Sequence, residues 1–411
     1  MILLPLLAML TAGCGGGGGV SAAGSATSDL IFTREQAAQH GAWTVLVYLD
    51  ADNDLESAGI NNFNQMEKVG STKDSRIIVQ IDRKEGYDTT NGDWTGTRRY
   101  LITRDTNTQI MASVRLDDPA LGEKDMANTQ TLRDFVEWGM QNFPADHYCL
   151  VLWDHGSGWE IRSSSILPQY KYIIADDTSY SGMNVTQIPQ ALEGLHMDVI
   201  AFDACMMQQL EVAYQMRNSA DYMTGSAAPE PSSGYNYSTW LAHIGSTTSP
   251  VRLCQTIVDR YAAAYPAPYQ GITQSAIDLG RISNVADAAS SFAQALISSG
   301  EGNWTKVKTA RESALDYSVC ANGIERYSLD LIDYAYKCNI NIGTAQIQSA
   351  YTDLQSAVSD AIIAETHNPD TSNAHGLAIY VPSPRAYDSR YLQLDLAQDT
   401  SWDEWLDSQL Y

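Results

Sequence analysis

The thiol of Cys205 and the imidazole of His155 are the side chains of this sequence best placed for covalent chemistry. Each follows an apolar run that predicts a buried strand, at 147–156 and 197–204. Active sites of parallel α/β sheets form beyond the carboxyl ends of strands, so neighbouring strands would bring both groups to one edge. A thiolate attacks a carbonyl carbon while imidazole transfers protons, which is acyl-transfer chemistry. A lone cysteine at such a junction is more often a packing residue, and it is the pair that favours catalysis.

Backbone groups beside this pair could complete an acyl-transfer site. We expect a helix from Cys205 onward, because Met207, Leu210 and Tyr214 have helical spacing. The positive end of its dipole would lower the pKa of the thiol. The N–H groups of Gly156 and Cys205 are the candidates for an oxyanion hole, which would hold the negative oxygen of the reaction intermediate.

Further apolar patterns predict the elements that must position these groups. In the first half we expect strands at 43–50, 76–83, 99–104, 147–156 and 197–204, and a helix at 129–142 capped by Asn128 or Thr129. In the second half we expect helices around 285–298, 304–317 and 325–337, a helical stripe of Ile347, Tyr351, Leu354, Val358 and Ile362, and a strand at 376–382. This order predicts an α/β fold: a mostly parallel sheet with helices on both faces and a more helical C-terminal part.

The N-terminal segment predicts export. Residues 1–14 resemble a bacterial lipoprotein leader, with Cys14 as the lipidated residue, although no Lys or Arg precedes the apolar stretch and Thr11 stands where Leu is commoner. A plain secretory signal is the alternative. We expect a cell-envelope lipoprotein or a secreted bacterial protein, in contact with the membrane only through a lipid anchor. Residues 15–40 would be a flexible tether, 41–280 the catalytic core and 281–411 a helical part that completes the fold.

Composition excludes several function classes. The 411 residues carry a formal charge of −24, which disfavours nucleic acid as a partner because the phosphate backbone rewards Lys and Arg. The six cysteines form no C-x-x-C pair, which argues against a thiolate zinc site, and whether Cys320 and Cys338 pair stays open. The other six histidines show no metal-ligand spacing such as H-E-x-x-H, and no G-x-S-x-G marks a serine hydrolase.

The segments WDHGSGW (153–159) and VIAFDACMM (199–207) together resemble the clostripain family of cysteine peptidases, which are akin to caspases, gingipains and legumains. Further similar segments are WTVLVYLDADNDLE (43–56), ADDTS (175–179), PEPSSGYNYSTWL (229–241) and GLAIYVP (376–382), so that the likeness covers residues 42–385. The resemblance implies a caspase-like fold, a His155/Cys205 dyad and cleavage of proteins or peptides after basic P1 residues. It also implies self-cleavage between His155 and Cys205, for which Lys171 in the 157–180 loop is the candidate, and sometimes a calcium requirement.

The acids of the family's P1 pocket are only partly present. Asp203 matches the acid two residues before the nucleophile, whereas Ser233 stands where the family usually has a second acid. Losing one buried counter-charge would weaken selectivity for Arg and Lys, and Glu230 could compensate. Asp203 could instead cap the helix expected after it. The loss at 233 leaves an alternative function open, a catalytically weak cell-surface binding protein on the same fold.

The segment DADND (50–54) has the spacing of an EF-hand start, with acids at positions one, three and five. Leu55 occupies the glycine position and Asn61 the place of the final glutamate, so an EF-hand is rejected. A calcium site of another kind stays open, whereas a solvated turn before the next helix is the simpler interpretation. No cofactor is required by the sequence.

Overall fold

Four apolar runs in the first half of the chain form the parallel strands at the centre of the sheet. The computed structural model describes residues 32–117, 120–160, 172–320 and 328–409. The four strands are β1 (Gly41–Ala51), β2 (Ser75–Arg83), β5 (Ala145–Trp153) and β8 (Met197–Asp203), which lie in the order β8-β5-β1-β2. Each neighbouring pair is parallel. The predicted α/β fold with a mostly parallel sheet is therefore confirmed.

Shorter strands on both sides extend this sheet to nine strands in total. Beyond β2 lie β3 (Arg98–Leu101) and β4 (Val114–Arg115), both antiparallel to their neighbours. Beyond β8 lie β9 (Ala220–Gly225), which is parallel to β8, and then β10 (Thr273–Asp278) and β12 (Ile362–His367), which are antiparallel. Two small sheets pair β6 (Ile174–Asp176) with β7 (Ser181–Met183), and β11 (Ser328–Asp330) with β13 (Ala378–Tyr380).

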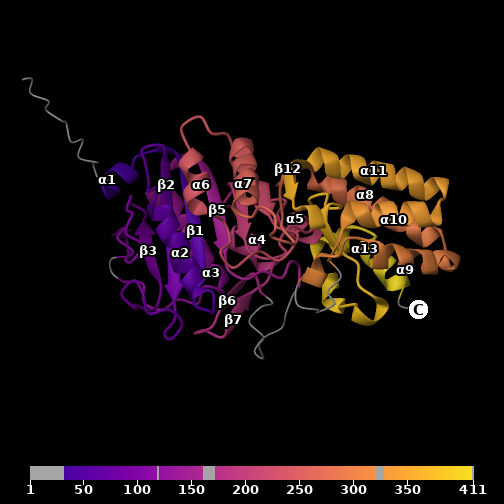
Figure 1. The fold of residues 1–411 in the computed structure, drawn as a ribbon, viewed down its shortest axis with the longest axis horizontal. Helices are drawn as coiled ribbons and strands as arrows, with labels where there is room; N and C mark the ends of the chain where they lie inside the picture. The colour runs from indigo at the N-terminus through magenta and orange to yellow at the C-terminus, as the bar shows by residue number, and fades with distance from the viewer. Residues whose placement is uncertain (1–31, 118–119, 161–171, 321–327, 410–411) are drawn as a thin grey trace, which may run out of the picture. The chain divides into compact units, whose positions relative to one another are not determined.

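Helices bury a hydrophobic core on each face of the sheet (Figure 1). Alternate side chains of a strand point to opposite faces, so that Val45 and Val47 enter one core while Leu46 and Tyr48 enter the other. Helices α2 (Glu56–Glu67), α6 (Tyr237–Trp240) and α7 (Pro250–Ala264) contribute to the first core. Helices α3 (Thr129–Asn142), α4 (Gln187–Ala191) and α5 (Leu210–Met216) contribute to the second.

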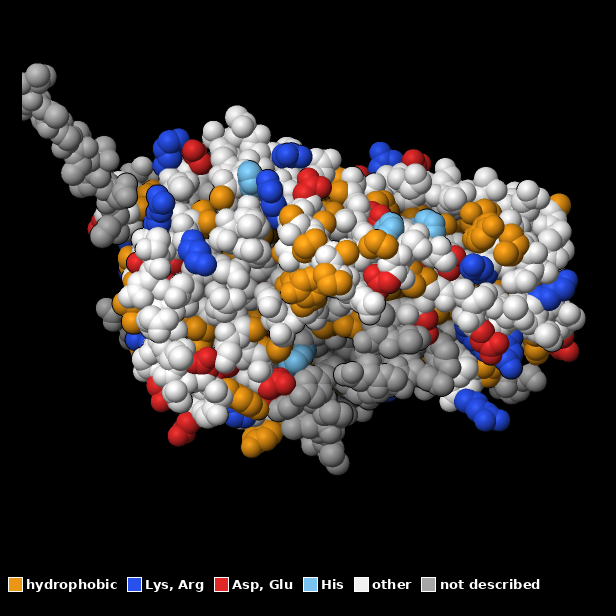
Figure 2. All heavy atoms as spheres, in the orientation of Figure 1, with side chains coloured by type: hydrophobic (Ala, Val, Ile, Leu, Met, Phe, Trp, Pro, Cys, Tyr) orange, Lys and Arg blue, Asp and Glu red, His pale blue; other side chains and the backbone are white. Residues whose placement is uncertain are grey.

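The C-terminal helices pack together beyond the β12 side of the sheet, where Figure 1 draws them in orange and yellow. They are α8 (Ile282–Ser298), α9 (Trp304–Ser313), α10 (Leu331–Ile342), α11 (Ala345–Ala361), α12 (Asp395–Asp399) and α13 (Trp402–Ser408). Their apolar side chains join the second core. In the described ranges, no helix combines the length and the apolar character needed to cross a membrane. On the face drawn in Figure 2, acidic and basic side chains are interspersed, as expected of a solvated surface.

Two expectations about individual elements are wrong, and a third holds only in part. No helix begins at Cys205, since α5 starts at Leu210. Ile362 does not continue the helical stripe, because α11 ends at Ala361 and Ile362 opens β12. The strand expected at 376–382 is shorter, Ala378–Tyr380, and pairs outside the large sheet. The domain division at residue 280 stays a prediction, and a four-residue helix, α1 (Arg34–Ala37), lies inside the segment expected as a tether.

Candidate active site

The two reactive side chains leave the same edge of the sheet from adjacent strands. Trp153 of β5 and Asp203 of β8 are register partners, and His155 and Cys205 each follow their strand by two residues. The backbone N–H of Asp154 donates to the carbonyl of Asp203 over 3.4 Å, which continues the ladder one step beyond the strands. Both residues are partly exposed rather than sealed in the interior. Parallel strands thus bring together two groups fifty residues apart in the chain.

The residue after the histidine, Gly156, has no space for a side chain. A Cβ at this position would lie 2.1 Å from the carbonyl oxygen of Cys205 and 2.6 Å from its nitrogen, closer than any side-chain carbon approaches backbone. The loop after β5 and the loop after β8 therefore touch through their backbones, and this contact fixes the separation of the two reactive residues.

Asp54, in the loop after β1, orients the imidazole. Its Oδ1 lies 2.8 Å from Nε2 of His155, and Oδ1 of Asp154 accepts the backbone N–H of His155 over 2.6 Å. Burial lowers the pKa of His155, but the hydrogen bond to Asp54 and the charges of Asp154 and Asp54 outweigh this and raise it above the ordinary value. Sequence reasoning assigned no role to Asp54, although it noted the DADND segment that carries it.

The backbone around Cys205 forms a strained turn. Met206 has φ of +64°, a left-handed conformation that is costly for a side chain of this size. Residues after it pair across the fold: the N–H of Met206 donates to Ala228, and that of Gln208 donates to Ser226. These long-range bonds take the place of helical ones and explain why the helix expected at Cys205 begins five residues later. The argument that a helix dipole lowers the thiol pKa is therefore withdrawn.

A backbone amide contacts the sulfur of Cys205 instead. The N–H of Glu230 donates to Sγ over 3.2 Å. The sulfur also lies 3.8 Å from the carbonyl oxygen of Glu230, to which a thiol can donate. The segment that follows β9 thus holds the sulfur through both backbone groups of Glu230, in the place where we had expected a helix.

Two buried carboxyl groups lie behind the thiol. Asp203 accepts the N–H of Tyr235 through Oδ1 over 2.9 Å and the hydroxyl of Tyr237 through Oδ2 over 2.7 Å. Burial raises the pKa of Asp203 to about 6. Burial, and then the charges of Asp203 and Cys205, raise the pKa of Glu230 much further, so that Glu230 is the protonated member and hydrogen-bonds to Asp203.

Ser233, the other predicted pocket residue, belongs to the turn that follows Glu230. Ser233 is exposed, and its carbonyl accepts the side-chain amide of Asn62 over 3.0 Å. The next residue, Gly234, has φ of +54°, and a Cβ there would lie 2.3 Å from Oδ1 of Asp203. The turn therefore closes over Asp203 through a glycine. The alternative that Asp203 caps a helix is wrong, because its acceptors are used by Tyr235 and Tyr237 and no helix follows directly.

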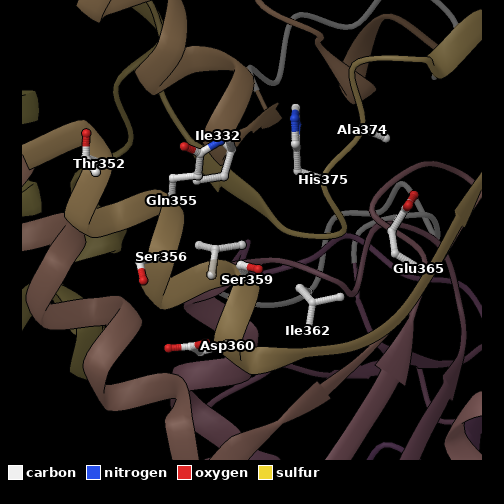
Figure 3. A pocket seen from close by; sticks show the side chains of 11 residues that line it. Ile332, Thr352, Gln355, Ser356, Ser359, Asp360, Ile362, Glu365, Ala374 and His375 are labelled. Carbon is white, nitrogen blue, oxygen red and sulfur yellow. The ribbon is translucent and has the colours of Figure 1, made fainter. Parts of the chain in front are cut away.

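Two further predicted residues, Cys14 and Lys171, lie outside the described residues, as does the side chain of Cys320. A surface cavity of about 660 Å³, shown in Figure 3, lies elsewhere, between α10, α11 and the start of β12. Its lining includes Glu365 and His375 but neither reactive residue of the candidate site.

Comparison with known proteins identifies relatives at both sequence and fold level. The sequence profile of the clostripain family matches residues 47–408. Clostripain of Hathewaya histolytica is 30% identical over 217 residues, which cover 47% of this chain and 40% of clostripain. The aligned part thus spans less than half of the length of that relative.

Two solved structures share the fold. A secreted C11 cysteine protease from Bacteroides thetaiotaomicron, in complex with an irreversible peptide inhibitor, superposes with a TM-score of 0.66 at 22% identity, over 89% of this chain and 100% of that one. An inactive zymogen C11 protease from Parabacteroides distasonis gives a TM-score of 0.62 at 21% identity, over 88% and 99% of the two chains. At these identities the likeness establishes the fold.

Proposed function

This chain belongs to the clostripain family of cysteine peptidases, and we propose on this basis that it is an endopeptidase that uses Cys205 as nucleophile and His155 as general acid and base. The observation that carries the proposal is the register of β5 and β8: both residues stand two positions beyond the paired Trp153 and Asp203, at one edge of the sheet. The backbone contact between Gly156 and Cys205 supports it, because the two loops cannot separate without losing that fit.

The proposed reaction is acyl transfer through a thioester. The thiolate of Cys205 attacks the scissile carbonyl carbon, and the N–H groups of Gly156 and Cys205 hold the resulting oxyanion. His155 gives its proton to the leaving amine, after which it takes a proton from the water that hydrolyses the acyl-enzyme. Asp54, 2.8 Å from the imidazole, keeps the ring oriented and favours its protonated form.

The pair Asp203 and Glu230 supports a preference for Arg or Lys at P1. Both carboxyl groups lie behind the sulfur, and one proton is shared between them. A cationic side chain entering there meets one negative charge at once and gains a second if Glu230 releases its proton. Glu230 thus takes the place of the acid missing at Ser233, and the selectivity for cations is weaker than with two permanently ionised acids.

Self-cleavage and export belong to the same proposal. Lys171 lies in the chain between His155 and Cys205 and is a basic P1 residue for processing by the enzyme itself. The leader at 1–14 supports export, with Cys14 as the lipid anchor and the only contact with a membrane, and the neighbour from Bacteroides thetaiotaomicron is described as secreted. Protein or peptide chains are the proposed substrates.

Active-site labelling tests the dyad directly. A peptidyl ketone inhibitor ending in Lys should label the wild type, and labelling should vanish in Cys205→Ala and fall at least about 100-fold in His155→Ala. The matched control is Cys254→Ala, since that thiol is buried and burial raises its pKa. Labelling that persists in Cys205→Ala, or that Cys254→Ala abolishes equally, would refute the assignment. Wild-type protein that stays unclipped at the size of Cys205→Ala would refute self-cleavage.

A further inference from the structure

A second surface cavity lies among the C-terminal helices, between α9 and the segment that follows β13. Its volume is about 640 Å³, and its lining includes Trp304, Lys308 and Arg311 of α9 and Arg385 of that segment. The three residues of α9 are four and three positions apart, so they share one face of the helix. The lining includes neither His155 nor Cys205, and the cavity is therefore separate from the candidate active site.

The guanidinium of Arg311 is buried without an acid that balances its charge. Only 7% of this residue is exposed. Its Nη1 donates to the carbonyl of Pro382 over 3.2 Å, whereas its Nε has no hydrogen-bond partner and no acidic side chain within the described ranges pairs with it. A buried charge is costly unless it is paired and hydrogen-bonded. An anion in the cavity would therefore stabilise a group that the described residues leave unbalanced.

Two more cations line the same cavity, together with a single acid, Glu312. Lys308 and Arg385 are both exposed. Nζ of Lys308 lies 3.7 Å from Oε1 of Glu312, with 63% and 60% of the two side chains exposed. A pair as solvated as this is weak, so Lys308 stays available to a ligand. Three cations against one acid give the cavity an excess of positive charge, although the whole chain has a formal charge of −24.

We propose that this cavity binds a small organic phosphate, a phosphate monoester whose organic part packs against Trp304. A phosphate monoester carries a charge of about −1.5 to −2 near pH 7, which matches the excess of cations, whereas one carboxylate would neutralise only part of it. The planar fork of donors on Arg311 fits the oxygens of a phosphate group. The volume of about 640 Å³ is typical of small-molecule sites and leaves room for an organic part beside the half-buried indole of Trp304.

Calorimetric titration of the intact protein with phenyl phosphate at low salt tests the site without any activity assay. We expect one phenyl phosphate per chain, and an affinity at least about tenfold weaker in the double variant Lys308→Gln/Arg385→Gln. Both side chains are exposed, so the fold should tolerate the two changes. Lys306→Gln is the matched control, an exposed lysine of the same helix outside the cavity lining, and should bind as the wild type does.

A second variant tests the contact with the organic part of the ligand. Trp304→Ala should weaken the binding of phenyl phosphate about fivefold, because the phenyl ring loses its aromatic partner. The affinity for inorganic phosphate should stay the same in this variant, since inorganic phosphate has no organic part to pack against the indole.

The competing results are distinct. Absence of stoichiometric binding of phenyl phosphate, or wild-type affinity in Lys308→Gln/Arg385→Gln, overturns the site. Binding of benzoate as tight as that of phenyl phosphate overturns the choice of phosphate over carboxylate. Equal losses for phenyl phosphate and inorganic phosphate in Trp304→Ala overturn the role of the indole. A protein that binds phenyl phosphate as expected but does not label with the peptidyl ketone refutes the proposed peptidase function and leaves this site intact, so that the two proposals fail separately.

Discussion

The two groups of buried acids at this edge of the sheet differ in what satisfies them. Behind Cys205, both oxygens of Asp203 accept hydrogen bonds, from Tyr235 and Tyr237, whereas the buried oxygens of Glu230 receive no N–H or O–H donor from the described residues and share a proton with Asp203. Behind His155, Asp50 and Asp52 each accept one backbone N–H through Oδ1, while Oδ2 of each is buried without a hydrogen-bond partner among the described residues. A buried carboxylate is stable only when it is paired, hydrogen-bonded or bound to a metal.

The two groups therefore differ in whether a second carboxyl group that shares its proton and tyrosine donors lie beside the buried carboxylate. The carboxyl pair of Asp203 and Glu230 is stable in the free protein. A positively charged side chain would add a favourable electrostatic interaction, but the fold does not require it. On the other side, Asp52 and Asp82 carry like charges that lie close together in a buried place, and burial together with repulsion holds protons on them. The first arrangement is compatible with a transient cationic substrate group, whereas the second keeps its carboxyl groups protonated to a higher pH than usual.

The largest effect in this comparison should come from Asp203. Asp203→Ala leaves the Tyr237 hydroxyl and the Tyr235 N–H buried without an acceptor, at a cost of about 1–3 kcal/mol each, so the free energy of unfolding should fall by roughly 2–6 kcal/mol. Asp203→Asn keeps an acceptor oxygen and should lose about 1 kcal/mol. Urea denaturation of the three proteins measures these differences.

Asp203→Asn also separates charge from packing in substrate selection. The wild type should prefer a P1 Arg substrate over its neutral isostere citrulline, and in Asp203→Asn the ratio of the two kcat/KM values should fall by about 30-fold, the effect of about 2 kcal/mol. An unchanged ratio would show that Asp203 does not contact the P1 side chain. Equal stability of Asp203→Ala and the wild type would show that the hydrogen bonds from Tyr235 and Tyr237 to Asp203 do not stabilise the fold.

Glu230→Gln should have a smaller effect that grows with pH. Burial and Asp203 raise the pKa of Glu230, so Glu230 stays protonated in the folded chain while it ionises in the unfolded one. The stability that it contributes is present below its ordinary pKa of about 4.3 and is lost as the pH rises through its folded pKa. Gln cannot ionise, so the melting temperature of Glu230→Gln should match the wild type near pH 4.5 and exceed it by about 2 °C near pH 8.

The control for this measurement is Glu193→Gln, whose exposed side chain should give parallel melting curves at both pH values. If Glu230→Gln also ran parallel to the wild type, Glu230 would be ionised in the folded state. The proton that Glu230 is expected to share with Asp203 would then be absent.

The central sheet could be predicted from sequence because its strands are long apolar runs. Residues 43–50 and 197–204 match β1 and β8 within two residues at every end. Four outer strands, β4, β9, β10 and β12, were missed, and two of them show the reason. The strand β10 reads TQSAID, which is too polar for the expected pattern, and β12 follows α11 without a loop, so that Ile362 fits the helical period as well as the strand. In both cases the conformation is decided by pairing with strands that lie far away in the sequence.

The candidate site could be predicted in its positions but not in its supporting contacts. The placement of His155 and Cys205 follows from strand order alone. The partners of these residues come from distant segments: Asp54 lies 101 residues before His155, and the Glu230 amide lies 25 residues after Cys205. Such contacts depend on how loops cross the sheet edge, which no local pattern encodes. The roles of Gly156, Asp203, Glu230 and Ser233 stay predictions.

The smallest change in unfolding free energy should come from Asp54→Asn, which tests the contacts on the His155 side of the sheet edge. The hydrogen bond to Asp54 raises the folded pKa of His155, so its stabilisation is present below the ordinary pKa of about 6.5 and is lost as the pH rises through the folded value. Asp54 is about one-third exposed, with 35% of its side chain accessible, and solvent therefore screens the pair. We expect a loss in unfolding free energy of about 0.5–1 kcal/mol at pH 5.5 that shrinks at pH 8.5.

The matched control for Asp54→Asn is Asp221→Asn, which removes the partner of His196 in a pair with 60% and 53% of the two side chains exposed. That change should have almost no effect at either pH, because both groups are solvated. If Asp54→Asn behaved in the same way, the loop after β1 would not hold the imidazole. The two sides of the sheet edge would then be chemically independent.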